Sequence, residues 1–249
     1  MKNNLNSQVL VLAAGDLESN FNLSGFKSPK NLLKINGLPL LYSVIYSFIS
    51  AGFNKIIVAI RKEEEEIFLT SKIIMEMFDK KIDCSIEFVF TLESQGPIAT
   101  ALLCSDKIDK SKSLIISSGD LIYVDTDMPI LKDLIKDEID CGLVTSNSFE
   151  DRWAYVNLDG DFPIEITPKG VISDIYAVGI YYFKSFDFFY TCAQYVLINM
   201  IEIYNYLHLS NLITSSKIFT NKVKALNVNK NMLLVIASPG DYRKFLKTK

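Results

Sequence analysis

Residues 8–41, QVLVLAAGDLESNFNLSGFKSPKNLLKINGLPLL, contain the pattern that decides the fold. The apolar run at residues 9–14 is rich in β-branched side chains and ends at Gly15, which is typical of a buried parallel strand. Residues 16–27 are mostly polar and predict a loop that leaves the carboxyl end of this strand. Because open α/β sheets bind their ligands at that end of the strands, we expect the loop to border a binding site.

A lysine and a helix follow this loop. Pro29 fixes the local backbone, so Lys30 is held near the strand end, where its ammonium group can meet a phosphate. Most lysines are only solvated surface residues, but the neighbouring proline favours the phosphate role. Asn36-Gly37 predicts a tight turn, and a helix should begin near Pro39. The apolar face of that helix would contain Leu40, Leu41, Val44, Ile45, Phe48 and Ile49.

Composition limits the class of protein. The chain has 249 residues, of which 49% are hydrophobic and 22% charged, and this predicts a single domain over residues 1–249. The net charge is −3 and no basic stripe is present, so we expect no nucleic acid partner. The sequence has no apolar run of about 18 residues and no signal-peptide pattern, so we expect no membrane span and a cytoplasmic location.

Cysteine and histidine chemistry is also limited. The cysteines lie far apart without C-x-x-C spacing and are interpreted as buried hydrophobic residues in a reducing compartment. The single histidine, His208, lies in an apolar patch and is interpreted as a half-buried structural residue, because no G-x-S-x-G motif accompanies it. The cysteines are Cys84, Cys104, Cys141 and Cys192.

Further apolar runs at residues 55–60, 85–90 and 114–118 predict parallel strands joined by right-handed helical crossovers. Between the first two, residues 61–80 predict an amphipathic helix. Its block of four glutamates, residues 63–66, is better interpreted as an acidic first turn than as a metal site. The core candidates of this helix are Ile67, Phe68, Ile73, Ile74, Met77 and Phe78.

Two loops after strands carry candidate site residues. Gln95 and Gly96 precede a helix that begins with small residues, and its free N–H groups could face a ligand. An ordinary loop and helix cap would explain the same residues equally well. After the strand at 114–118, Asp120 follows Gly119 at a carboxyl end, where a carboxylate can hold Mg²⁺ as the ion bridges phosphate oxygens. Asp125 and Asp127 are interpreted as solvated or helix-capping carboxylates.

The second half of the chain predicts an antiparallel addition to the sheet. A strand at 141–146 precedes short strands at 153–160 and 163–169, and another strand covers 174–183. Residues 186–213 predict a long apolar helical segment, and Tyr204 and Tyr206 in it would suit a partner interface such as a homodimer. A last strand at 223–228 and a closing helix at 239–246 complete the chain.

Several of these segments resemble the nucleotidyltransferase family that makes nucleotide sugars and related activated phosphates. The resemblance rests on Leu12-Ala13-Ala14-Gly15, on G-F-K-S-P-K at 25–30, on L-L-K-I-N-G-L-P-L at 32–40, and on I-S-D-I-Y-A-V-G-I-Y-Y-F at 172–183. S-P-G-D-Y-R-K-F at 238–245 is also similar to a late family motif. This resemblance implies a Rossmann-like α/β fold, a mixed and mostly parallel sheet flanked by helices.

The resemblance also implies a reaction and a set of site residues. An acceptor phosphate, by default a sugar-1-phosphate, would attack an NTP, more often a pyrimidine one, and release pyrophosphate. Lys30 would steady the triphosphate, Asp120 would bind Mg²⁺, and Lys169 would contact the acceptor phosphate. The similar branch is linked to surface polysaccharide assembly. The nucleotide would lie against Ala13, Ala14, Gly15, Gln95, Gly96, Ser118 and Gly119.

Two departures from the family pattern leave an alternative open. The family has a glycine and an arginine after L-A-A-G, where this chain has Asp-Leu-Glu-Ser-Asn at 16–20. The late segment at 232–236 contains no acid, so a second metal ligand would have to come from elsewhere, with Asp174 and Glu202 as candidates. The alternative is a catalytically weakened or inactive member that binds a nucleotide or a protein partner.

Overall fold

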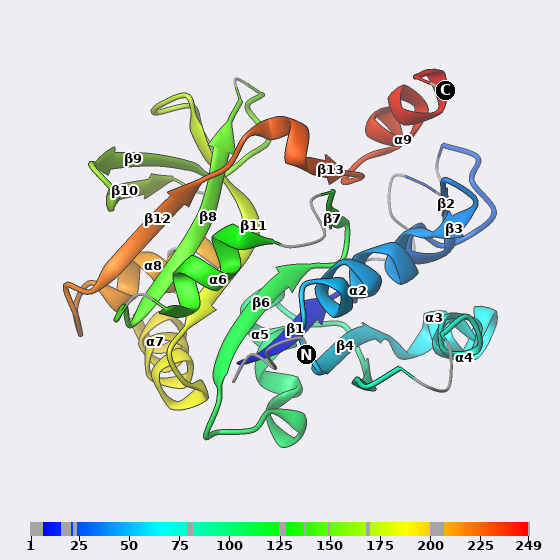
Figure 1. The fold of residues 1–249 in the computed structure, drawn as a ribbon, viewed down its shortest axis with the longest axis horizontal. Coiled ribbons are helices and arrows are strands. Elements are labelled where there is room, and N and C mark those ends of the chain that lie inside the picture. Colours follow the sequence, from blue (N-terminus) through cyan, green and yellow to red (C-terminus); the bar gives the residue numbers. More distant parts are fainter. Residues whose placement is uncertain are drawn as a thin grey trace.

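The computed structural model describes residues 7–15, 21, 24–78, 82–124, 128–136, 138–148, 150–167, 170–199 and 207–248. They form a nine-stranded mixed sheet with helices on both faces (Figure 1), which confirms the predicted α/β fold. The strand order is β10-β9-β11-β6-β1-β4-β5, and β8 and β12 continue from β11. The strands are β1 (Ser7–Leu12), β4 (Lys55–Arg61), β5 (Ser85–Thr91), β6 (Ser113–Ser118), β8 (Cys141–Asn147), β9 (Tyr155–Asp159), β10 (Phe162–Thr167), β11 (Ile175–Phe183) and β12 (Val223–Asn227).

The two halves of the sheet differ in direction. β1 pairs in parallel with both β4 and β6, and β4 pairs in parallel with β5. Beyond β6 the sheet becomes mixed, because β11 runs against β6, β8 and β9, whereas β12 pairs in parallel with β8. The predicted hairpin also forms, since β10 pairs antiparallel with β9. The parallel half therefore brings the carboxyl ends of β1, β4 and β6 to one edge.

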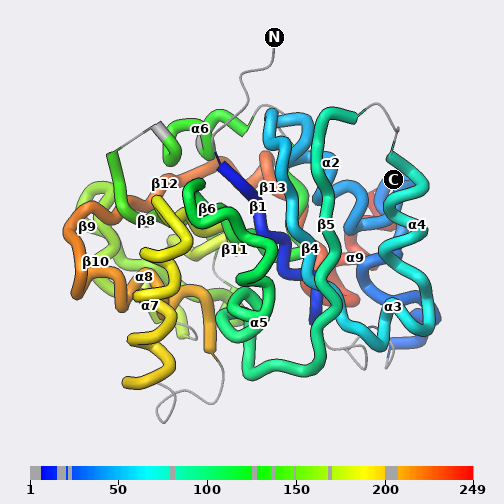
Figure 2. The backbone as a smooth tube through the Cα atoms, turned by 90° about the horizontal axis from the view of Figure 1, so that it is seen from below, coloured from blue at the N-terminus to red at the C-terminus, as the bar shows by residue number. Residues whose placement is uncertain are grey.

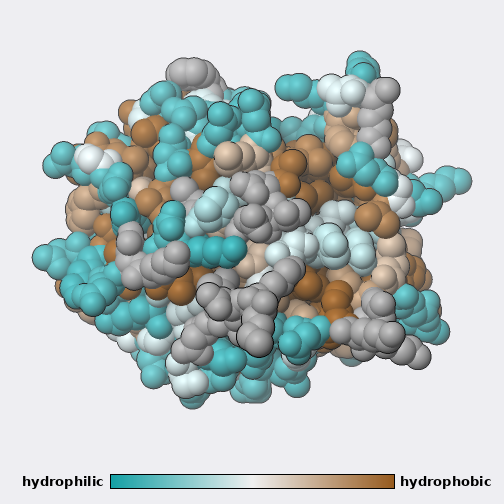
Figure 3. All heavy atoms as spheres, viewed as in Figure 1, coloured by the Kyte–Doolittle hydropathy of each residue, from teal (hydrophilic) through white to brown (hydrophobic). Residues whose placement is uncertain are grey.

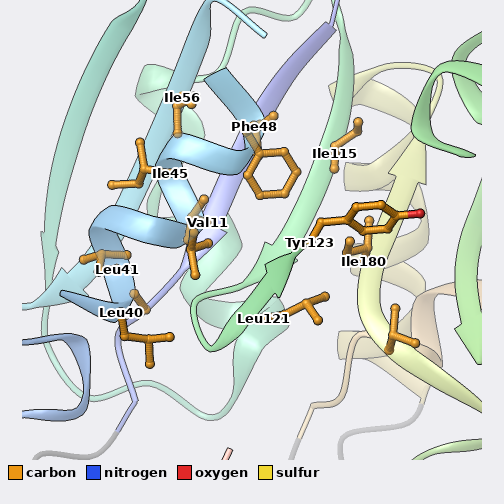
Figure 4. Packing of buried hydrophobic residues seen from close by; sticks show 14 of the residues in the cluster. Val11, Leu40, Leu41, Ile45, Phe48, Ile56, Ile115, Leu121, Tyr123 and Ile180 are labelled. Carbon is orange, nitrogen blue, oxygen red and sulfur yellow. The ribbon is translucent and has the colours of Figure 1, made fainter. Parts of the chain in front are cut away.

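Helices cover the sheet in two layers. Figure 2 shows α2 and α6 on one side of the strands and α5 and α7 on the other. In Figure 4, Val11, Ile56 and Ile115 of three neighbouring strands point toward α2. They pack there against Ile45 and Phe48, which are part of the apolar face predicted for that helix. The helices are α2 (Leu40–Ser50), α3 (Lys62–Phe68), α4 (Thr70–Glu76), α5 (Pro97–Leu103), α6 (Pro129–Lys136), α7 (Phe186–Asn199), α8 (Ser210–Ser216) and α9 (Pro239–Lys247).

The helix predicted over residues 61–80 is interrupted. Leu69 adopts a left-handed conformation, with φ of 50°, and separates α3 from α4. This break changes which side chains face the core: Ile74 and Phe78 are buried, but Ile67 is 61% exposed. Ile73 and Met77 are also exposed, so half of the predicted core face was wrong. The acidic first turn forms as predicted, and within it Glu64 is buried.

The helical segment predicted over residues 186–213 also divides. α7 ends at Asn199 and α8 begins at Ser210, while Tyr204 and Tyr206 lie outside the described residues. His208 lies just before α8 and is half-buried, as predicted, although it is not helical. Asp125 and Asp127 also lie outside the described residues.

The C-terminal segment returns to the first half of the chain. β13 (Leu233–Val235) pairs antiparallel with β7 (Leu121–Tyr123), directly after β6. α9 then begins with a capping box between Ser238 and Asp241. Arg152 donates two hydrogen bonds to the Asp241 carboxylate, each of 2.8 Å, and so ties α9 to the segment before β9. In Figure 1, α9 lies near the hairpin of β2 (Lys34–Ile35) and β3 (Leu38–Pro39).

Most of the cysteines are buried, as the sequence predicted. Three cysteines are buried, and burial raises the pKa of Cys104 to about 12, so that it behaves as a neutral hydrophobic residue. Hydrophilic and hydrophobic residues are interspersed on the face shown in Figure 3. None of the helices in the described ranges is long and apolar enough to cross a membrane.

Candidate phosphate and nucleotide site

The candidate site is built where β1 and β6 end side by side. The Gly119 amide donates to the Leu12 carbonyl over 2.8 Å, which places the turn after β6 against the turn after β1. A Cβ atom on Gly119 would lie 2.5 Å from the Ala13 Cβ, so only glycine fits at this approach. Three predicted site residues, Ala13, Ser118 and Gly119, therefore share this strand edge.

Lys30 and Asp120 meet at the same edge. Lys30 begins a short 3-10 turn directly after Pro29, and its Nζ atom lies 2.8 Å from Oδ2 of Asp120. Burial opposes the charged form of Asp120, but the Lys30 ammonium and its hydrogen bond outweigh this effect, so the pKa of Asp120 is lowered. The sequence separation of these two residues is 90, so the fold alone creates this pair.

A cleft borders the turn after β1. It has a volume of about 320 Å³ and contains three of the predicted nucleotide-binding residues, Ala14, Gly15 and Gly96. Lys30 and Asp120 are not part of its lining. The lining residues are Leu12, Ala14, Gly15, Arg61, Glu93, Ser94, Gly96, Pro97 and Thr100.

The requirement for glycine at position 96 has a local cause. Gly96 has φ of 114°, and a Cβ atom there would lie 2.9 Å from the backbone nitrogen of Leu207. The Leu207 amide also donates to the Gln95 carbonyl over 3.1 Å. Gly96 thus admits the backbone of Leu207, and it also lines the cleft. The neighbouring Ser94 and Thr100 hydroxyls, joined over 2.7 Å, supply polar groups to the cleft.

Sequence reasoning missed one residue of the cleft. Arg61 is the last residue of β4, and among the described residues of the lining it is the only basic one. Within the described ranges its guanidinium forms no ion pair or hydrogen bond. Its position offered a signal, because a cation at the carboxyl end of a parallel strand faces the ligand edge of the sheet.

The donor groups fit Mg²⁺ only in part. Within the described residues no group of three or more His, Cys, Asp or Glu side chains could hold a metal. One carboxylate such as Asp120 is compatible with Mg²⁺, which keeps several waters and takes substrate phosphate oxygens. The acid-free late segment lies beside Asp120, since the Ile236 amide donates to the Asp120 carbonyl over 2.9 Å.

Of the other candidate residues, the structure describes Asp174 but not Lys169 or Glu202. Asp174 accepts a hydrogen bond of 3.0 Å from the Asn147 side chain at the start of β11. Lys169, Glu202 and the altered loop at residues 16–20 lie outside the described residues.

Comparisons with known proteins agree with the observed fold. A family model described as Nucleotidyl transferase matches residues 8–196. A nucleoside-diphosphate-sugar pyrophosphorylase from Vibrio cholerae RC9 is similar in structure, with a TM-score of 0.80, 16% identity, and coverage of 96% of this chain and 99% of that one. The inositol-1-phosphate CTP transferase from T. maritima has a TM-score of 0.74 at 13% identity, over 99% of this chain and 96% of that one. A UDP-glucose pyrophosphorylase from Acinetobacter baumannii has a TM-score of 0.71 at 14% identity, over 96% and 92%. Among curated proteins, none matches the chain.

Proposed function

Because the chain belongs to the Nucleotidyl transferase family and is an enzyme of that family, we propose that it joins an NTP, a pyrimidine nucleotide for preference, to a small phosphorylated acceptor. The observation that carries this proposal is the pair of Lys30 and Asp120 beside the turn after β1. The pair combines a cation suited to phosphate with a carboxylate suited to Mg²⁺. The cleft beside the same turn has a volume of about 320 Å³ and is lined by Ala14, Gly15 and Gly96, which the resemblance assigns to nucleotide binding.

The proposed reaction needs no nucleophile from the protein. An oxygen of the acceptor phosphate forms a bond to the α-phosphorus of the NTP, and the bond to the leaving pyrophosphate breaks. The chain's own residues would position the reactants and neutralise charge. Lys30 would exchange the Asp120 carboxylate for a phosphate oxygen, and this exchange would leave Asp120 able to accept a cation.

Asp120 is the residue that would hold Mg²⁺. When bound, the ion would neutralise charge on the phosphate oxygens, which is its usual contribution to phosphoryl transfer. Members of the family typically use Mg²⁺. A site that rests on the Asp120 carboxylate is consistent with an ion that takes most of its oxygens from water and substrate.

Arg61 is the proposed replacement for the arginine that residues 16–20 lack. It lines the cleft together with Gly15, and its guanidinium is free of partners in the described part of the chain. A guanidinium group can bind phosphate oxygens through two N–H groups at once, which a lysine cannot do. The position of Arg61 therefore favours an active member of the family over the inactive alternative.

The acceptor would be a sugar-1-phosphate or another small phosphate, used in surface polysaccharide biosynthesis. The I-S-D-I-Y-A-V-G-I-Y-Y-F motif at residues 172–183 supports this, and most of it forms β11 beside β6. Lys169 is the proposed contact for the acceptor phosphate. These finer assignments rest on the sequence resemblance.

The deciding experiment is release of pyrophosphate. Wild-type protein would be incubated with Mg²⁺, each of CTP, UTP and dTTP, and a panel of sugar-1-phosphates and other small phosphates. Release that requires both an NTP and one acceptor would support transfer. Binding of an NTP by calorimetry without release for any acceptor would support the alternative, a weakened or inactive member that binds a nucleotide.

A further inference from the structure

A buried glutamate lies next to the phosphate site and takes no part in the proposed reaction. Glu64, in the first turn of α3, is 3% exposed, whereas its neighbours Glu63 and Glu66 are exposed. Its carboxylate accepts hydrogen bonds from Thr70 Oγ1 over 2.8 Å and from Asn31 Nδ2 over 2.9 Å. Burial raises the pKa of Glu64, while the bonds from Thr70 and Asn31 oppose that shift.

Asn31 connects this glutamate to the candidate site. It is also 3% exposed and directly follows Lys30 in the chain. Its Nδ2 atom donates to the Ala13 carbonyl over 2.9 Å as well as to both oxygens of Glu64. Because both neighbours are acceptors, the amide nitrogen must face them. In the described chain, Asn31 Oδ1 is left without a donor.

The break between α3 and α4 completes this arrangement. The left-handed residue Leu69 ends α3, and Thr70, at 0% exposure, begins α4 and donates to the Glu64 carboxylate. The carboxylate thereby joins the segment that begins at Lys30 to α4, and through the Asn31 amide it is linked to the turn after β1. A conformation that an L-residue rarely adopts is used here to supply one buried donor.

We infer that Glu64 is a positioning residue for phosphate binding, which through Asn31 holds the Lys30 segment against the turn after β1. The inference rests on the proposed function, in which Lys30 and that turn hold the triphosphate. Glu64 itself would touch no substrate. Its acceptor oxygens fix the orientation of the Asn31 side-chain amide. That amide in turn holds the Ala13 carbonyl, so the backbone next to Lys30 is held against the turn after β1.

The test compares substitutions at one buried and one exposed glutamate of the same helical turn. Calorimetric titration with CTP, UTP and dTTP in Mg²⁺ would be performed on wild type, Glu64→Ala, Glu64→Gln and Glu63→Ala. We expect Glu64→Ala to weaken the binding of the preferred NTP about tenfold, which corresponds to one lost hydrogen-bonded tie. Glu63→Ala should bind like wild type, because its side chain is exposed.

Glu64→Gln keeps one carbonyl oxygen for Asn31 and can donate to the Thr70 hydroxyl, so its affinity should stay within about twofold of wild type. It also removes a carboxylate that is costly to bury, so its thermal midpoint at pH 7 should equal or exceed that of wild type. If Glu64→Ala does not fold, Asn31→Ala removes the same tie from the other side and carries the same tenfold expectation.

A double-mutant cycle separates positioning from general stability. If Glu64 acts through the Lys30 segment, Lys30→Ala combined with Glu64→Ala should bind no more weakly than Lys30→Ala alone. A loss of stability with unchanged affinity, or additive losses in the cycle, would overturn the inference while leaving the proposed function intact. Equal binding by wild type and Lys30→Ala would overturn the placement of the triphosphate, and this inference with it.

Discussion

Two ion pairs of the same length perform different tasks in this molecule. Lys30 and Asp120 meet over 2.8 Å at the end of β6, and Arg152 and Asp241 meet over 2.8 Å at the start of α9. Both aspartate side chains are 18% exposed. Distance and burial therefore do not distinguish the pair in the candidate site from the pair that fastens a helix.

The number of contacts around each pair does distinguish them. Arg152 holds both oxygens of Asp241, contacts Glu150 as well, and covers the Trp153 ring at 4.2 Å. Lys30 holds Asp120 by one bond from an ammonium group. A pair joined by one point charge can exchange partners with a phosphate and a cation, whereas a two-pronged pair is a structural tie.

Asp120→Asn should break the first pair with the largest effect. The substitution keeps the size of the side chain but removes the anionic oxygen that Mg²⁺ prefers, so pyrophosphate release should fall by about a hundredfold or more. The fold should remain intact, which circular dichroism and thermal unfolding would check. Near-normal turnover at saturating Mg²⁺ would remove Asp120 from the site.

Lys30→Ala should have the next largest effect. Losing one charge-assisted contact to the triphosphate costs roughly 1.5–3 kcal/mol, which corresponds to a loss of about ten- to a hundredfold in NTP affinity. Calorimetry with CTP, UTP and dTTP, with and without Mg²⁺, would measure it. Micromolar binding that is unaffected by the substitution would contradict the placement of the triphosphate at this pair.

Arg61→Ala removes a cation that, unlike Lys30, forms no ion pair within the described residues and so gives up no protein contact when it binds phosphate. We expect a loss of NTP affinity of about tenfold, smaller than the largest effect of Lys30→Ala because Arg61 is partly solvated. Arg61→Lys serves as the control, since it keeps the charge but cannot bind through two N–H groups. If the alanine variant binds as wild type does, Arg61 does not replace the arginine missing from residues 16–20.

The sequence predicted elements and strand-end residues better than it predicted side-chain partners. The apolar runs that became β1, β4 and β6 are buried from both faces, so their composition alone marks them. Lys30 and Asp120 are 90 residues apart, and their positions after strand ends predicted one shared edge, but nothing in the sequence predicted that the two side chains touch. The burial of Glu64 could not be predicted, because residues 63–66 are all glutamate and the sequence does not show which of them faces the core. The helix break at Leu69, which brings Thr70 to Glu64, was not predicted either.

Arg152→Ala should break the second pair and leave the first unchanged. Losing the two-pronged contact to Asp241 should lower the free energy of unfolding by about 1–2 kcal/mol, a value reduced for partial exposure. Urea unfolding would measure it, with Arg152→Lys as a control that restores the charge alone. NTP affinity should stay within about twofold of wild type, and a larger change would show that this pair also serves the site.

The smallest expected effect is the pH dependence of this structural pair. Burial opposes the charge on Asp241, but the hydrogen bonds from Arg152 and Ser238 outweigh it and lower its pKa. Because the folded pKa lies below the unfolded one, near 3.9, the pair stabilises the protein above about pH 4 and loses that contribution as the pH falls further. The difference in unfolding free energy between wild type and Arg152→Ala should therefore be constant from pH 7 to about pH 5 and shrink below about pH 4. Urea titrations of both proteins across this range would measure it, and a difference that grows on acidification would contradict a charged Asp241 as the partner of Arg152.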